Sequence, residues 1–257
     1  MMDAGVQTFT IRAAQRRSTE NAYLPLIKLG IRKLEISRMD FSEKNAIAVR
    51  ALVDKYGIEV ASLQVKPKEV FGDPERIIKF CKITGCTRVV ISMLPFKCIL
   101  GSEKRFFEFL STLDPQCDLY AEHGITLAYH HHNWEYVTLS SGKMRMDELL
   151  DRTSKLKFVH DTYWTAKCGI DPTVQIERFG ARLLGVHLRD LALYKKGLDV
   201  RARDAALGDG VLDFAKIATA AERVGAEYLV IEQKTDTPYS DIEKSYTYFK
   251  SLTEVSK

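Results

Sequence analysis

The segment Leu127–Tyr136 (LAYHHHNWEY) carries the densest group of chemically reactive side chains in this 257-residue chain. Three of the six histidines stand in a row at positions 130–132, and Glu135 follows them. Imidazoles and carboxylates bind divalent metals, and an imidazole also transfers protons near neutral pH. The other interpretations are a solvated loop or a polar part of the core, and the surrounding elements decide among them.

Side chains of the same kind interrupt or follow other apolar runs. Together with Glu135 they supply three carboxylates and one imidazole, which favour Mn²⁺, Mg²⁺, Co²⁺ or Fe²⁺ and also permit Zn²⁺. Structural roles compete with this interpretation, because a carboxylate can cap a turn and a histidine in an apolar strand is often a core residue. An unpaired charge in the run LVIE would be very costly, so a site role is expected there. The four candidate metal ligands are Glu135, Asp161, His187 and Glu232.

Eight short apolar segments have the pattern of parallel strands that are covered on both faces. Amphipathic stretches at helical spacing lie between them, and a glycine suited to a left-handed C-cap precedes six of the seven following strands. The alternation predicts a single-domain (βα)8 TIM barrel over residues 1–257, with a doubly wound open sheet as the alternative. The eight segments are 5–9, 32–37, 59–65, 88–94, 125–129, 156–160, 183–188 and 227–232, and the glycines are Gly30, Gly57, Gly85, Gly124, Gly180 and Gly225.

Such a barrel collects the residues that follow its strands at one mouth, where its active site lies. Polar residues at the strand ends are therefore expected to contact a substrate. We expect glutamine and glutamate side chains to bind hydroxyl groups, cations to bind an anionic or hydroxyl-rich end, and a tryptophan to form a wall or lid. These residues are Gln7, Glu35, Gln64, Trp164, Arg189 and Lys234.

Proton transfer is assigned to the side chains nearest the expected metal. In an extended segment His130 and His132 face one way and His131 faces the other. We expect His132 to act as the acid or base, with Glu135 and Glu232 as further proton-transfer groups.

Composition limits the classes of function. The net charge of +4 comes from scattered basic residues, so neither nucleic acid nor a membrane surface is expected as a partner. No apolar run reaches the length of a membrane helix, and the N-terminus lacks a signal-peptide core. The five cysteines have no CxxC spacing, which indicates reduced thiols in a cytoplasmic protein.

Six segments in order make the chain similar to the sugar phosphate isomerase/epimerase family, also called the xylose isomerase-like TIM barrels. They are GVQTFTIR, YHHHNWEY, HDTYWTAKCGIDP, GVHLRD, LGDGVLDFAKI and LVIEQ. The resemblance covers essentially the whole chain and implies a divalent metal in the barrel mouth. The family's Glu, Asp, His and Glu ligands fall on Glu135, Asp161, His187 and Glu232.

The chain departs from the family pattern at several of these segments. A gapless match would place Tyr129 at the first ligand position, where it is a poor ligand, and His132 is the alternative to Glu135. His131 replaces a common Asn, Arg189 replaces Lys, and Lys234 stands where the family has Asp. An arginine keeps the charge but changes the donor geometry, so a specific activity does not transfer.

The resemblance implies a metal-dependent isomerase or epimerase of a keto or aldo sugar that removes a proton beside a carbonyl. The metal would stabilise the resulting enediolate. A lyase acting on a keto sugar or inosose is the alternative, and a non-catalytic sugar-binding or subunit barrel is the second. A metal-cluster endonuclease of the same superfamily is disfavoured by too few histidines. A homo-oligomer or a partner subunit is possible, and the glycines of Leu207–Asp213 predict a tight turn, with a loop over the mouth as the alternative.

Overall fold

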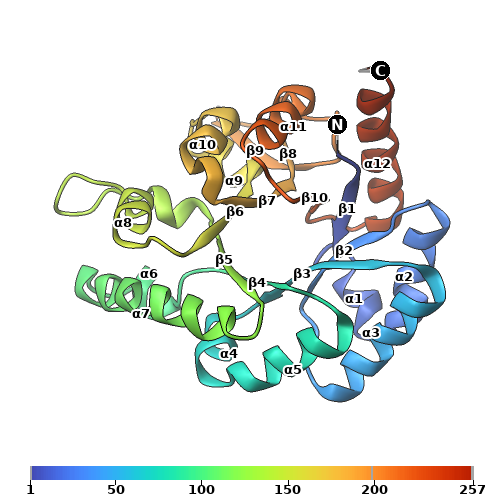
Figure 1. Cartoon of the computed structure of the whole chain (residues 1–257). Helices are drawn as coiled ribbons and strands as arrows, with labels where there is room; N and C mark the ends of the chain where they lie inside the picture. The colour runs from blue at the N-terminus through green and yellow to red at the C-terminus, as the bar shows by residue number, and fades with distance from the viewer. Residues whose placement is uncertain (1, 198, 256–257) are drawn as a thin grey trace.

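Eight parallel strands close into a barrel in the computed structural model, which describes residues 2–197 and 199–255 (Figure 1). Each strand overlaps one of the eight segments predicted from the sequence, so the TIM-barrel prediction is confirmed. Around the barrel the strands follow the order β1-β10-β7-β6-β5-β4-β3-β2. They are β1 (Ala4–Gln7), β2 (Lys33–Ser37), β3 (Glu59–Val65), β4 (Arg88–Ile91), β5 (Thr126–His130), β6 (Lys157–Asp161), β7 (Leu183–Leu188) and β10 (Tyr228–Ile231).

Helices surround the barrel and connect its strands (Figure 1). Helices α5 and α10 begin at aspartate caps, since Asp73 and Asp171 accept hydrogen bonds from backbone N–H groups of the first turn. All six glycines predicted at helix ends have positive φ. The longer helices are α2 (Thr19–Lys28), α3 (Glu43–Tyr56), α5 (Pro74–Thr84), α7 (Glu103–Ala121), α8 (Arg145–Arg152), α10 (Pro172–Phe179), α11 (Phe214–Arg223) and α12 (Pro238–Val255). Shorter turns are α1 (Arg12–Gln15), α4 (Pro67–Gly72), α6 (Phe96–Ile99), α9 (Thr162–Lys167), η1 (Asn133–Tyr136) and η2 (Gly180–Arg182).

The apolar core has two layers. The larger layer lies between the strands and the helices, and a smaller one fills the barrel interior. Gly185 makes room for the largest interior side chain, because a Cβ there would lie 2.5 Å from the ring of Tyr228. The Tyr228 hydroxyl in turn donates to Glu35 at 2.9 Å. The interior residues are Ala61, Val90, Ala128, Val159, Leu184, Tyr228 and Val230.

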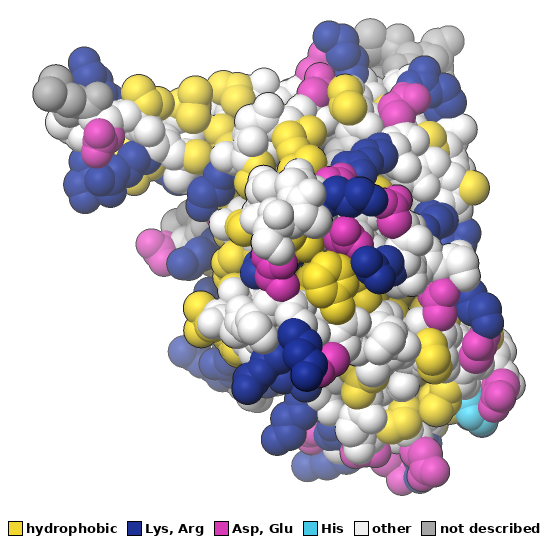
Figure 2. All heavy atoms as spheres, turned by 90° about the vertical axis from the view of Figure 1, so that its left-hand side faces the viewer, with side chains coloured by type: hydrophobic (Ala, Val, Ile, Leu, Met, Phe, Trp, Pro, Cys, Tyr) yellow, Lys and Arg dark blue, Asp and Glu magenta, His cyan; other side chains and the backbone are white. Residues whose placement is uncertain are grey.

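An antiparallel hairpin was not predicted from the sequence. It comprises β8 (Asp190–Lys196) and β9 (Asp199–Ala205), follows β7 directly, and projects from the body as an arm (Figure 2). At its base Asp204 lies opposite Leu191. The hairpin therefore returns a carboxylate to the end of the barrel where the strands finish.

The Leu207–Asp213 segment forms a turn, as the sequence predicts. Both oxygens of the buried Asp190 carboxylate accept backbone N–H groups, two of them from Gly208 and Gly210 at 3.0 and 2.9 Å. Asp213 then caps α11 by accepting from the backbone N–H of Lys216. Among the described residues, no helix combines the length and apolar character needed to cross a membrane.

Candidate metal centre

Strand alternation directs four potential ligands into the barrel mouth. His130, Asp161 and Glu232 each lie two residues beyond an interior residue of the same strand, namely Ala128, Val159 and Val230. Because side chains two apart face the same way, the three polar side chains continue the interior face at its open end. With His187 of β7 they offer four ligand atoms that all lie within 4.8 Å of one another, the one such group among the described residues.

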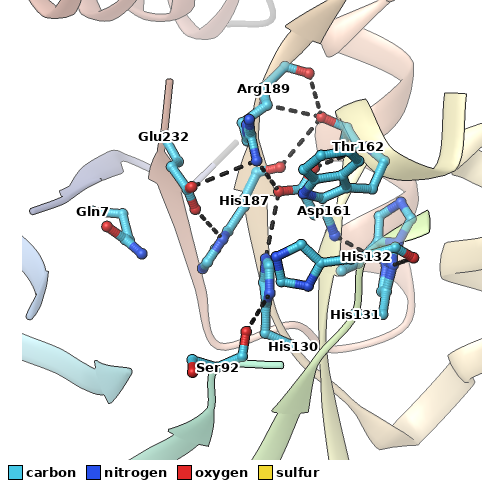
Figure 3. Close-up of polar contacts among 12 residues, drawn as sticks. Gln7, Ser92, His130, His131, His132, Asp161, Thr162, His187, Arg189 and Glu232 are labelled. Carbon is cyan, nitrogen blue, oxygen red and sulfur yellow. Dashed lines mark hydrogen bonds and ion pairs between the residues drawn. The ribbon is translucent and has the colours of Figure 1, made fainter. Parts of the chain in front are cut away.

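The four side chains are buried and face one another (Figure 3). His130 Nε2 lies 3.4 Å from Asp161 Oδ2, and His187 Nδ1 lies 2.8 Å from Glu232 Oε2. His130 Nε2, His187 Nδ1 and Glu232 Oε2 nevertheless make no hydrogen bond of good geometry. Buried polar atoms without partners need a structural explanation, and a shared cation would provide one.

The outer nitrogens of both imidazoles lie close to other polar groups. His130 Nδ1 lies 3.3 Å from the carbonyl oxygen of Ser92, and His187 Nε2 lies 2.7 Å from Glu35 Oε1. Glu35 also accepts from Ser62 Oγ at 2.5 Å, so its own position is fixed. Metal-binding histidines usually have such a carbonyl or carboxylate partner, which sets the ring orientation and leaves the other nitrogen for the ion.

A guanidinium already touches two of the four candidate ligands. Arg189 Nη1 lies 3.0 Å from Asp161 Oδ2 and 3.5 Å from Glu232 Oε1. The other side of the guanidinium donates to Asp204 Oδ1 of the hairpin at 2.6 and 3.0 Å. Its carbon also lies 4.9 Å from the Tyr163 ring centre and 5.3 Å from that of Trp164. The arginine is therefore locked beside the ligands.

The charges in the group are strongly coupled. Burial would raise the pKa of Asp161 and Glu232, but the Arg189 charge and the neighbouring imidazoles hold both pKa values below the ordinary range. Burial would lower the pKa of His187, but Glu35 and Glu232 raise it to about 10. A bound divalent ion would displace the His187 proton, as metals do when they compete for an imidazole nitrogen.

Two imidazoles and two carboxylates fit a divalent transition metal. Nitrogen donors suit Fe²⁺, Co²⁺ and Zn²⁺, while carboxylates suit Mn²⁺ and Mg²⁺, so the mixed set is compatible with the ions expected from the sequence. The orphaned buried atoms and their mutual distances make the same case. We conclude that the residues present fit such an ion.

Glu135 lies outside the group, although the sequence analysis expected it to be a ligand and a proton-transfer group. It is fully buried, accepts from the Tyr129 hydroxyl, and accepts from the backbone N–H of His132 at 2.7 Å. Tyr129 packs in the layer between strands and helices, because it alternates with the inward-facing Ala128 and His130. His130 therefore stands in the candidate ligand group where Glu135 was expected, and Glu135 supports the turn that carries His132.

His132 lines a cavity of about 660 Å³ beside the group. Its ring stacks on Trp134 at 5.0 Å and lies 5.3 Å from Trp164, which also lines the cavity. Burial and the nearby His130 lower the pKa of His132 well below its ordinary value. His132 is consequently neutral at pH 7.

Of the remaining residues expected to contact substrate, some line the cavity and others are buried away from it. Gln64, Trp164, Arg189 and Lys234 line the cavity. Gln7 is buried and donates to Gln64 Oε1 at 2.9 Å, so it lies behind the cavity wall. Glu35 is fully buried beside His187 and does not line the cavity.

Sequence reasoning passed over two residues of the site. The signal for His130 was present, because Ala128–His130 has the same two-residue spacing as Val159–Asp161 and the first residue of each pair is buried inside the barrel. Nothing in the sequence pattern indicated Asp204, which reaches the mouth only through the hairpin.

Comparisons with known proteins agree with this architecture. Residues 26–252 match the family model described as xylose isomerase-like TIM barrel. A sugar phosphate isomerase/epimerase from Parabacteroides distasonis is similar in structure, with a TM-score of 0.79, 20% identity, and 97% and 93% of the two chains covered. A probable 3-DHS dehydratase from Bacillus anthracis has a TM-score of 0.75 and 14% identity, with 97% of this chain and 99% of that chain covered. An L-ribulose 3-epimerase has a TM-score of 0.72 and 14% identity, with 99% of this chain and 95% of that chain covered.

These similarities at low identity establish the fold. No curated protein matches the sequence significantly. The chain is a closed TIM barrel that carries at its mouth a buried group of side chains able to hold a metal ion. Because the family model covers most of its length, the chain belongs to the xylose isomerase-like TIM barrel family.

Proposed function

We propose that this protein is a divalent-metal-dependent isomerase or epimerase that moves a proton next to the carbonyl of a keto or aldo sugar. The observation that carries the proposal is the group of four buried ligand atoms within 4.8 Å of one another at the edge of the cavity. Its structural neighbours include a sugar phosphate isomerase/epimerase and an L-ribulose 3-epimerase, which is consistent with this class of chemistry.

Each residue near the group receives a role from its position. His130, Asp161, His187 and Glu232 would hold the ion, which would supply Lewis-acid stabilisation of the negative charge that develops on the substrate oxygens. His132 lines the cavity beside the group, so its position suits it to accept the proton from the carbon beside the carbonyl. The Trp164 ring forms an apolar wall suited to the hydrogen-bearing face of a sugar.

The test combines metal content with proton exchange. We expect the purified chain, loaded with Mn²⁺ and desalted, to retain about one ion per chain. Incubated in D₂O with a panel of keto sugars and inososes, it should incorporate deuterium at a carbon next to the carbonyl of one of them. Glu232→Gln should weaken Mn²⁺ binding by ~100-fold and abolish the exchange, because it removes a ligand charge.

Glu243→Gln is the matched control, since that glutamate is exposed on α12. It should retain both the metal and the exchange. The absence of bound metal in the wild-type chain, or unchanged exchange in Glu232→Gln, would exclude the proposal. A non-catalytic sugar-binding barrel would show sugar binding without exchange.

A lyase is the second candidate, because a probable 3-DHS dehydratase is among the structural neighbours and elimination begins with the same proton removal. The D₂O experiment separates the two. An isomerase or epimerase yields a product of unchanged mass apart from deuterium, whereas a dehydratase yields a product that has lost water.

The cytoplasm is the compartment we propose for this activity. All five cysteines are free, and four of them are buried. Free thiols persist where the redox potential keeps cysteine reduced.

A further inference from the structure

The cavity has two unlike halves. His130, Asp161, His187 and Glu232 come from the neighbouring strands β5, β6, β7 and β10. The opposite half follows β1, β2 and β3 and carries three cations, Arg16, Arg38 and Lys66, which we call the far wall. Strands β2 and β3 stand across the barrel from β7 and β6, so a ligand in the cavity lies between the metal group and the far wall.

The far-wall cations outnumber the carboxylates that line the cavity beside them. These carboxylates are Asp40 and Glu69, and both pair with Arg76, at 3.2 and 3.1 Å. Within residues 2–197 and 199–255, no ion pair joins Arg16, Arg38 or Lys66 to a carboxylate. On the other side of the cavity Arg189 is engaged by acidic groups, and Lys167 and Lys234 also line the cavity. The far wall itself presents three cations to a ligand.

Arg38 is held at this wall against its backbone preference. Its φ of 58° makes it the one non-glycine residue with positive φ in the described part of the chain. The preceding residue, Ser37, is fixed by Thr8 and Gln15, since its carbonyl accepts from Thr8 Oγ1 at 3.1 Å and from Gln15 Nε2 at 2.8 Å. Glycine would adopt this conformation without strain, and strained side-chain-bearing positions concentrate at functional sites.

We propose that the far wall is an anion subsite, which binds a carboxylate or phosphate group at the end of the sugar remote from the reacting carbons. The inference rests on the proposed function and adds the substrate class, an acidic sugar. The guanidinium of Arg38 offers a planar pair of donors and Lys66 a mobile point charge, the two forms of cation that bind such oxyanions. A cavity of about 660 Å³ is large enough for a substrate that spans both halves.

Equilibrium binding to the full chain tests the subsite. The probes are glucuronate for a carboxylate, glucose 6-phosphate for a phosphate and glucose as the neutral sugar, titrated calorimetrically with and without Mn²⁺. We expect at least one acidic sugar to bind about tenfold more tightly than glucose, and the tighter one identifies the anion. Arg38→Gln and Lys66→Gln should each remove most of that advantage and leave glucose binding unchanged.

Lys68→Gln is the matched control, because Lys68 is exposed on α4 and lies outside the cavity. It should alter none of the affinities. Thermal unfolding of each variant checks that it folds. Equal affinity for all three sugars, or an acidic-sugar advantage that survives Arg38→Gln and Lys66→Gln, would overturn the subsite.

Failure of the proposed function gives a different result. Asp161→Asn should abolish Mn²⁺ binding but retain the preference for the acidic sugar in metal-free buffer. A wild-type chain that binds no metal but prefers an acidic sugar would exclude the enzyme mechanism and retain the subsite. A chain that binds the metal without any preference for an acidic sugar would exclude the subsite and leave the enzyme mechanism standing.

Discussion

Arg189 brings a permanent positive charge to two candidate ligands, Asp161 and Glu232. A divalent ion must share these carboxylates with the guanidinium. Like charges a few ångströms apart repel even at the high effective dielectric of a protein site. The arginine would therefore lower the affinity of the proposed site for a metal, while its contacts hold the carboxylates in place.

Arg189→Met should bind Mn²⁺ about tenfold more tightly than the wild type, since it keeps the length of the side chain and removes the charge. Competition with a fluorescent chelator measures the affinity. Arg201→Met, at an exposed position of the hairpin, is the control and should leave the affinity unchanged. Weaker binding in Arg189→Met would mean that the guanidinium acts mainly by positioning Asp161.

Glu135 lies outside the candidate ligand group, and burial changes the pKa of its carboxyl group. Its burial raises the pKa to about 7, although the Tyr129 hydroxyl and the backbone N–H of His132 oppose the shift. Since the folded-state pKa lies above the unfolded value near 4.5, the protonated form favours folding. That contribution is complete below pH 4.5 and is lost as the pH rises through 7.

Glu135→Gln, which cannot ionise, should therefore gain stability relative to the wild type as the pH rises from 5 to 8. The relative gain should be on the order of 3 kcal/mol. Urea unfolding of both proteins at the two pH values gives the difference. A stability difference that is the same at both pH values would show that Glu135 ionises as readily in the folded protein as in the unfolded one.

At the scale of elements, the turn after the hairpin depends on Asp190. Its carboxylate accepts the backbone N–H groups of Leu191, Gly208, Gly210 and Leu212 at 2.8 to 3.2 Å. A Cβ at Gly210 would lie 2.1 Å from Asp190 Oδ1, so the glycine permits this close approach. One buried side chain thus replaces the hydrogen bonds that a regular element would supply.

Asp190→Asn should destabilise the protein by about 3 kcal/mol, because the amide presents only one acceptor oxygen to four buried donors. Urea unfolding measures the loss. Asp199→Asn is the control, since Asp199 lies exposed at the far end of the hairpin and should change stability little. A loss below 1 kcal/mol would mean that the amide satisfies the turn as well as the carboxylate does.

Elements with local signals were predictable from the sequence. Continuous apolar runs specify strands that are buried on both faces. Helix caps such as Asp73 act on neighbouring backbone groups. Both signals can be read from a short stretch of sequence. The β8–β9 hairpin was not predicted because its strands are largely exposed. Pairs such as Lys195–Val200 show no apolar pattern that would mark a buried strand. Asp204 escaped with it, since its place beside Arg189 is a long-range consequence of that pairing.

Within the candidate site, the structure brings together those predicted residues whose direction is set by a strand end. Asp161, His187 and Glu232 lie on or directly after strands and converge as expected. Glu135 belongs to the turn η1, whose path depends on the Tyr129 contact and not on any sequence period. The alternation Ala128–His130 would have identified the fourth member.

At the scale of the whole molecule, the barrel contains several histidines whose pKa is lowered by burial. His131 and His160 lie between the strands and helices, with His131 Nε2 3.0 Å from His160 Nδ1, and His132 lies at the mouth. Burial lowers the pKa of all three, that of His160 to about 3. Each is neutral in the folded protein near pH 6, whereas the unfolded chain protonates it below about pH 6.5.

This imbalance predicts acid unfolding well above the range of ordinary carboxylates. Below pH 6.5 the unfolded chain protonates three histidines whose pKa is lowered in the folded chain, while the raised pKa of Glu135 favours one proton in the folded state. The three histidines outnumber the one carboxyl group, so the free energy of unfolding should fall as the pH drops from 6 to 5.

Urea unfolding in chelator at pH 7.5, 6.0 and 5.0 measures this slope. His160→Leu should reduce the slope by about 1.4 kcal/mol per pH unit whatever its effect on absolute stability, because it removes one of the three groups. His123→Gln is the control, since His123 is exposed and its loss should leave the slope unchanged. A wild-type slope near zero would mean that the buried histidines take up protons in the folded barrel.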